Sequence, residues 1–217
     1  MARLLNLLDL LFPPRCALCG KETDTEYGLC GGCDAEIQYR PLLQTLSVPG
    51  GTKVSCVSAL EYAGITRNAV LSFKLKGKRR LESYFAKFMT LALEKTLPEA
   101  AFDAVAFIPM HKSTRKSRPY NQSEVLAAEL AKMLDIPLWR GVSLVRQIDK
   151  QHTLSREQRI QNVRGAYAAK DGIAGTRVLL VDDIVTTGST LAQASGALLA
   201  SGAANVVCIA AAAPLSN

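Results

Sequence analysis

An apolar run that ends in two adjacent acids constrains this chain more than any other feature. Residues 178–181 are apolar, Asp182 and Asp183 follow, and the turn 186–190 leads into a helical pattern. This order predicts a buried strand, a pair of acids and the N-terminus of a helix. The N–H groups at a helix N-terminus lack partners and carry partial positive charge, so the turn is suited to binding a phosphate.

The residue types in and before the turn match a sugar that bears a phosphate. Gly188 lets the backbone approach a phosphate closely. The acids accept hydrogen bonds, so they suit sugar hydroxyls or a hydrated Mg2+. Four hydroxyls can donate to phosphate oxygens: Thr186, Thr187, Ser189 and Thr190. The alternative is an ordinary strand–turn–helix with acids at the strand end.

Two CxxC pairs near the N-terminus predict a structural zinc site. The pairs have ten residues between them, and their members are Cys16, Cys19, Cys30 and Cys33. Four thiolates complete a tetrahedral Zn2+ and leave no position open for catalysis. A redox dithiol or free thiols are the alternatives. The other two cysteines, Cys56 and Cys208, are interpreted as small buried hydrophobes.

Composition and charge favour a globular chain with an anionic ligand. The 217 residues are 48% hydrophobic and carry a formal net charge of +7. Nucleotide phosphates, nucleic acid and acidic membrane surfaces all fit such a charge, and a generally basic surface is the alternative.

We expect residues 1–50 to hold a short N-terminal amphipathic helix, the zinc ribbon and a linker, and residues 51–217 to form the main domain. No export signal or apolar run of membrane-spanning length is seen, which predicts the cytoplasm.

From residue 54 onward, apolar strands alternate with helical patterns, which predicts an α/β fold with a parallel sheet. Expected strands cover residues 54–62, 104–108, 138–144, 177–181 and 206–212. Expected helices cover residues 65–97 with a break at Gly77, 121–134 with Asn121 or Ser123 as cap, and 190–200. Residues 35–53 are interpreted as a linker and 147–167 as a long functional loop. Ligands bind at the carboxyl ends of parallel strands, so residues 109–118, 147–167 and 182–190 should share one rim.

The segment after the strand at 104–108 is strongly basic. Residues 109–123 carry four cations and no acid, which would place positive charge where a pyrophosphate needs it. A solvated basic loop is the alternative. The two histidines, His111 and His152, are each compatible with an exposed loop position and are not favoured as catalytic groups.

Taken in order, these pieces resemble the ComF family over nearly the whole chain. They are the two CxxC pairs, the basic piece 73–77, the segment ending in Asn121-Gln122-Ser123, the motif 154–167 and the run 181–190. Residues 178–190 also resemble the phosphoribosyl pyrophosphate (PRPP) signature of type I phosphoribosyltransferases. The ComF family resembles these enzymes, carries an N-terminal zinc ribbon and is linked to natural competence, the import of DNA for transformation.

The resemblance implies roles for individual residues. Asp182 and Asp183, the residues expected to be catalytic, would hold the ribose hydroxyls of PRPP bound with Mg2+. Residues Thr186, Thr187, Gly188, Ser189 and Thr190 would hold its 5′-phosphate, and His111, Lys112 and Arg115 would lie in the pyrophosphate loop. Many relatives have Gly-Phe where this chain has Pro119-Tyr120, and proline removes a backbone donor there.

The function expected from the resemblance is that of a competence protein that binds PRPP–Mg and single-stranded DNA during DNA uptake. Basic blocks at 74–80, 112–118 and 146–164 would contact DNA phosphates. Rings for base stacking would come from Phe73, Tyr84, Tyr120 and Tyr167. DNA-translocation partners would hold the chain at the inner face of the membrane. The alternatives are a phosphoribosyltransferase that moves ribose 5-phosphate to an unidentified acceptor, and a regulator that senses PRPP.

Overall fold

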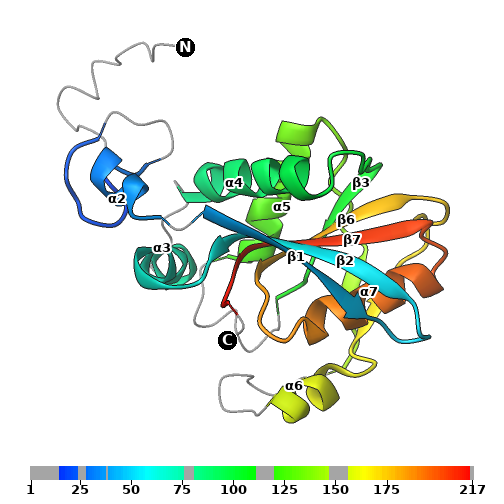
Figure 1. The fold of residues 1–217 in the computed structure, drawn as a ribbon. Helices are drawn as coiled ribbons and strands as arrows, with labels where there is room; N and C mark the ends of the chain where they lie inside the picture. The colour runs from blue at the N-terminus through cyan, green and yellow to red at the C-terminus, as the bar shows by residue number, and fades with distance from the viewer. Residues whose placement is uncertain are drawn as a thin grey trace.

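A five-stranded sheet forms the centre of the protein (Figure 1). The computed structural model describes residues 15–23, 28–37, 39–75, 81–110, 120–146 and 156–215. The strand order is β1-β2-β7-β6-β3, with bounds β1 Tyr39–Ser47, β2 Lys53–Glu61, β7 Asn205–Ala213, β6 Arg177–Ile184 and β3 Ala104–Phe107. Four strands run parallel, and only β1 is antiparallel to its neighbour. The expected α/β fold with a parallel core is therefore confirmed.

Helices cover both faces of this sheet, which explains why its central strands are almost continuously apolar. On one face lie α4 (Leu81–Thr96) and α5 (Gln122–Leu134), and on the other lies α7 (Ser189–Ala200) (Figure 1). Alternate residues of β6 enter the two cores: Leu179 packs with α4 and α5, whereas Leu180 packs with α7. Helix α3 (Gly64–Leu75) follows the carboxyl end of β2.

Most of the elements expected from the sequence are present. The expected helix at 65–97 is two helices, α3 and α4, and Gly77 lies outside the described residues. Asn121 caps α5, since its side chain accepts a hydrogen bond from the Ser123 N–H. The expected strand at 138–144 is shorter: Leu138 makes one bridge to Val105, and β4 (Val142–Leu144) pairs with β5 (Tyr167–Ala169) in a separate small sheet.

Two expectations about irregular segments were wrong. Residues 35–53 are not a linker, because β1 forms an edge of the main sheet and turns at Gly50 and Gly51, which both have positive φ. A proline at 41 is tolerated because an edge strand has N–H groups that need no partner strand. Residues 147–167 are not one loop, because α6 (Arg156–Val163) lies within them. The sequence pattern did not predict α6 because this helix has few apolar residues, although its Val163 is fully buried.

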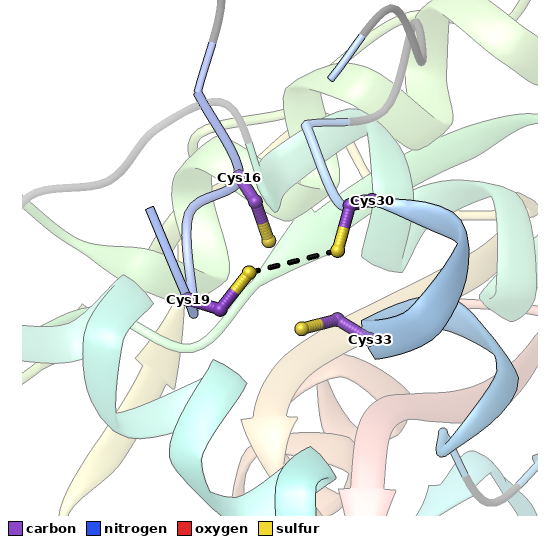
Figure 2. A group of neighbouring side chains, drawn as sticks. All are labelled: Cys16, Cys19, Cys30 and Cys33. Atoms are coloured by element: carbon purple, nitrogen blue, oxygen red, sulfur yellow. Dashed lines mark hydrogen bonds between the residues drawn. The ribbon is translucent and has the colours of Figure 1, made fainter. Parts of the chain in front are cut away.

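The four N-terminal cysteines come together as the sequence predicted (Figure 2). Their Sγ atoms all lie within 4.8 Å of one another, and those of Cys19 and Cys30 are 3.6 Å apart. Tetrahedral zinc with Zn–S bonds of about 2.3 Å separates its sulfurs by about 3.8 Å. Burial raises the pKa of the Cys16 thiol, but the N–H groups of Cys19 and Cys30 outweigh it and bring the pKa to about 6. Donor set and spacing therefore fit a structural Zn2+.

The zinc ribbon is attached to the main domain through α4. The Tyr84 hydroxyl donates a 2.8 Å hydrogen bond to the Asp34 carboxylate, next to Cys33 in the short helix α2 (Gly31–Ala35). Leu29 is 1% exposed and belongs to the same hydrophobic core as the α4 side chains. Burial, together with the charge of Asp34, raises the pKa of Tyr84. The metal site is thus tied to the domain by a buried contact.

We predict that Cys33→Ser abolishes stoichiometric zinc binding, because three thiolates and a hydroxyl do not replace four thiolates. Metal analysis of the purified wild type should give about one zinc per chain. The control is Cys56→Ala, which removes a buried thiol outside the cluster and should keep the metal. Full zinc content in Cys33→Ser would contradict the assignment.

Candidate functional site

The acid pair lies at the carboxyl end of a central strand. Asp182 and Asp183 belong to the last residues of β6, which pairs with β7 on one side and β3 on the other. Because β2, β7, β6 and β3 are parallel, their carboxyl ends share one edge of the sheet. Helix α7 begins shortly after the pair, at Ser189 following the turn. The acids and the helix N-terminus are therefore at the edge where α/β folds bind ligands.

Asp182 is held by two hydrogen-bond donors and has an unusual pKa. The Ser123 hydroxyl and the Asp183 N–H each donate to its Oδ1 at 2.8 Å. Burial, and then the negative charge of Asp183, raise the pKa of Asp182 to about 7, although Ser123, the Asp183 N–H and Lys74 oppose the shift. Near neutral pH both the protonated and the ionised forms of this carboxyl are therefore populated. The protonated form can donate a hydrogen bond, and both forms can accept one.

Asp183 forms an ion pair that the sequence interpretation missed. The Lys74 Nζ lies 2.9 Å from Asp183 Oδ2, and the two side chains are only 13% and 12% exposed. The expectation that Lys74 contacts DNA as part of a basic block is wrong, because its ammonium is directed at the acid pair. The basic piece 73–77 lies far from the acids in the chain, so no local pattern indicated this contact.

The start of α5 joins α3 to the acid pair. The Tyr120 hydroxyl donates to the Phe73 carbonyl at 2.6 Å, and the Gln122 side chain donates to the Lys74 carbonyl at 3.3 Å. The next residue, Ser123, holds Asp182. Carbonyls in the last turn of a helix have no intrahelical partner, so these donors satisfy the end of α3. The segment 120–123 thus fixes the positions of Lys74 and Asp182 together.

The turn before α7 has the conformation that a phosphate-binding turn requires. Gly188 has φ of 72°, in the left-handed region that L side chains rarely adopt, and a Cβ built there would contact a methyl group of Leu46. The backbone conformation at this position therefore favours glycine. The hydroxyls of Thr187 and Ser189 lie 2.8 Å apart, and both residues are partly exposed. Partly exposed hydroxyls gathered at a helix N-terminus can receive an anionic oxygen.

Tyr167 connects this turn to Asp182. Burial, and then the charge of Asp182, raise the pKa of its phenol, while a hydrogen bond with the Thr190 side chain opposes the shift. Tyr167 belongs to β5, and the nearby Gly165 N–H donates to Gln193 of α7 at 3.0 Å. The small second sheet therefore packs against the start of α7 and supports the turn.

Several expected site features are located elsewhere or are not described. His111, Lys112 and Arg115 lie outside the described residues. The prediction of stacking rings is wrong for Phe73, Tyr84 and Tyr167, which are at most 8% exposed. These three rings pack in the hydrophobic core instead. The fourth ring, that of Tyr120, packs against Phe73, with 5.5 Å between the two ring centroids. Cys56 and Cys208 are fully buried, as expected. No helix among the residues described is long and apolar enough to cross a membrane.

The oxygen donors at this edge fit the ligand set of Mg2+. Carboxylates and hydroxyls are hard donors of the kind that Mg2+ prefers, and Mg2+ usually binds through one or two carboxylates together with ligand phosphates. Asp182 and Asp183 supply the carboxylates. A cation at this pair would meet the ammonium of Lys74, which already lies on Asp183. The donor types at this edge therefore fit Mg2+, although Lys74 already occupies one oxygen of Asp183.

We predict that Asp182→Asn stabilises the fold at pH 8. The folded pKa of about 7 exceeds the unfolded value of about 3.9, so the folded state binds the proton more tightly, and stability falls as pH rises from about 4 to about 7. An amide keeps the acceptor for Ser123 without the buried charge. Urea unfolding should show the variant more stable than the wild type at pH 8, by on the order of 1 kcal/mol or more, with a smaller gap at pH 4.

The matched control is Asp171→Asn, which changes an exposed carboxylate and should unfold with the pH dependence of the wild type. If Asp182→Asn also kept that dependence unchanged, the raised pKa of Asp182 would be refuted.

Two family models match the chain. A double zinc ribbon domain matches residues 7–45, and a phosphoribosyl transferase domain matches residues 119–217. Between residues 7 and 45 the sequence has only four cysteines and no histidine, so it supplies one four-thiolate site. A solved adenine phosphoribosyltransferase from Saccharomyces cerevisiae is 15% identical, with a TM-score of 0.43, and the match covers 79% of this chain and 83% of that chain.

Curated relatives match most of the chain. DNA utilization protein YhgH of Escherichia coli O157:H7 is 30% identical over 200 residues, covering 88% of this chain and 86% of the relative. Competence protein F of Haemophilus influenzae is 28% identical over 189 residues, covering 84% and 77%. With its four-cysteine ribbon and its phosphoribosyltransferase-type domain, the chain belongs to the ComF family.

Proposed function

We propose that the chain binds PRPP together with Mg2+ at the edge formed by β6 and α7. The observation that carries this proposal is the acid pair at the carboxyl end of β6, followed directly by a left-handed glycine turn at a helix N-terminus. Acids alone would suit many ligands, and a helix N-terminus alone would suit any anion. Their succession from the end of β6 to the start of α7 matches a molecule with vicinal hydroxyls on one side and a phosphate on the other.

Each part of the ligand has residues suited to it. The 5′-phosphate is held by the N–H groups and hydroxyls of residues 186–190. The ribose hydroxyls are held by Asp182 and Asp183, and Asp182 can donate as well as accept because its pKa is about 7. Asp182 and Asp183 would hold Mg2+, which would neutralise negative charge on the pyrophosphate. We assign the pyrophosphate contact to His111, Lys112 and Arg115.

We infer further that the chain acts in DNA utilisation and uptake and contacts single-stranded DNA. The printed names of the relatives, a DNA utilization protein and a competence protein, support this role. The net charge of +7 favours binding to phosphates. Because Phe73, Tyr84 and Tyr167 are buried, contact with DNA would rest on Lys and Arg side chains. Partners that translocate DNA would bring the chain to the cytoplasmic face of the membrane.

The alternative is turnover of PRPP. A phosphoribosyltransferase would form a bond between the anomeric carbon of ribose and an acceptor nucleophile, while the bond to pyrophosphate breaks and Mg2+–pyrophosphate leaves. Pyrophosphate release in the presence of candidate bases separates this activity from binding alone. A sensor of PRPP would bind the ligand and release no pyrophosphate.

We predict that the chain binds PRPP together with Mg2+. Calorimetry with PRPP and Mg2+ should show one site per chain in the wild type, and Asp183→Asn should weaken it by about tenfold or more, since charged hydrogen bonds contribute about 1.5–3 kcal/mol. Asp171→Asn is the exposed control and should bind like the wild type. The absence of heat with the folded wild type would refute the proposed ligand.

We also predict that the chain binds single-stranded DNA. Affinity for a single-stranded oligonucleotide, measured by fluorescence anisotropy, should fall linearly on a plot of log affinity against log salt, because binding releases counterions. Asp183→Asn should keep the same slope. A salt-independent affinity, or no binding at low salt, would contradict a role in contacting DNA.

A further inference from the structure

The ion pair between Lys74 and Asp183 has the burial and geometry of a functional contact. The ammonium and the carboxylate are 2.9 Å apart, and roughly seven-eighths of each side chain is covered. Exposed ion pairs are screened by water and contribute little, but a covered pair loses most of that screening. Lys74 therefore places a positive charge directly against the Asp183 carboxylate at the edge of the sheet.

The position of Lys74 is fixed by the same segment that fixes Asp182. Lys74 lies in the last turn of α3, whose carbonyls accept hydrogen bonds from Tyr120 and Gln122. Gln122 is 1% exposed and also donates to the Tyr120 carbonyl at 3.0 Å. Ser123, one residue on, donates to Asp182. These contacts hold the end of α3, and with it the backbone of Lys74, beside the acid pair.

Lys74 also affects the acid pair as a whole. Its positive charge is one of the influences that hold down the pKa of Asp182, against burial and the neighbouring charge of Asp183. Two adjacent carboxylates at a partly buried edge would otherwise attract a metal cation from solution. An ammonium already on Asp183 repels a divalent cation that approaches the same oxygen.

We propose that Lys74 is the internal counter-ion of Asp183 and keeps divalent cations off the acid pair until a sugar diphosphate brings one. This inference rests on the proposed function and specifies the regulation of its site. Phosphate oxygens offer Lys74 a second partner, so the ligand can draw the ammonium away from Asp183 at the moment when its own cation takes over the carboxylate. Metal and ligand then bind together, and free Mg2+ in the cell does not occupy the site.

The test measures binding of Mn2+ alone, a spectroscopic substitute for Mg2+, to the full-length zinc-loaded protein at pH 8. Loss of the free Mn2+ electron paramagnetic resonance signal gives the affinity. We expect weak binding by the wild type and about tenfold tighter binding by Lys74→Met, a difference of about 1.4 kcal/mol. Lys74→Gln, which retains a donor without charge, serves if the methionine variant is poorly folded, and should show the same gain.

Two further variants locate the effect. Lys53→Met removes an equal charge at the amino end of β2, the opposite edge of the parallel sheet, and should bind Mn2+ like the wild type. Combining Lys74→Met with Asp183→Asn should cancel the gain. A purely structural role for the ion pair would lower the melting temperature of Lys74→Met and leave its Mn2+ affinity at the wild-type value.

The outcomes separate this inference from the proposed function. Unchanged Mn2+ affinity in both folded Lys74 variants, or a gain that survives Asp183→Asn, overturns the role of Lys74 even if PRPP binds. Failure of the wild type to bind PRPP with Mg2+ overturns the proposed function, and the inference with it. Tighter Mn2+ binding in the Lys74 variants together with PRPP binding by the wild type supports both.

Discussion

Strand β6 is hydrogen-bonded on both sides, and this pairing determines where every other part of the site lies. Parallel pairing to β7 and β3 aligns their carboxyl ends and brings Asp182 and Asp183 to that edge. The start of α7 then follows within a few residues, so its N-terminus faces the same edge. Helices α3 and α5 approach from the other face and supply Lys74 and Ser123. A shift of β6 by one residue would turn each acid to the other face of the sheet and separate it from these partners.

Placing two carboxylates side by side at a covered edge is unfavourable, and the fold limits this cost through specific contacts. Lys74 compensates Asp183, whereas Asp182 receives two donors and still retains a pKa of about 7. Ionisable groups with shifted pKa values are common at binding and catalytic sites. The ribbon near the N-terminus differs, because its four thiols suffice for one tetrahedral metal ion and its Asp34 carboxylate accepts a part-buried hydrogen bond from Tyr84. Its donor set therefore fits a structural metal.

Local patterns predicted the acid strand, the glycine turn and the cysteine cluster, because each is encoded within a short stretch of sequence. The pairing of Lys74 with Asp183 could not be predicted in this way, since it depends on how α3 packs across the sheet edge. The interpretation of Phe73, Tyr84 and Tyr167 as stacking rings was wrong because all three are buried. An aromatic ring is equally compatible with a core and with a surface, so the sequence did not distinguish the two. Residues 35–53 were interpreted as a linker because of their prolines and glycines, although they contain β1. Helix α6 was not predicted because most of its residues are polar. These errors arise where tertiary contacts outweigh local preference.

We propose that residues 186–190 and the acid pair form one site for a phosphorylated pentose. A crystal structure of the protein with PRPP and Mg2+ tests this most directly. We expect the 5′-phosphate on the N–H groups of residues 187–190, the ribose hydroxyls at Asp182 and Asp183, and Lys74 turned from Asp183 toward the diphosphate. Ligand density at any other edge of the sheet, with this turn empty and Lys74 still on Asp183, would contradict it.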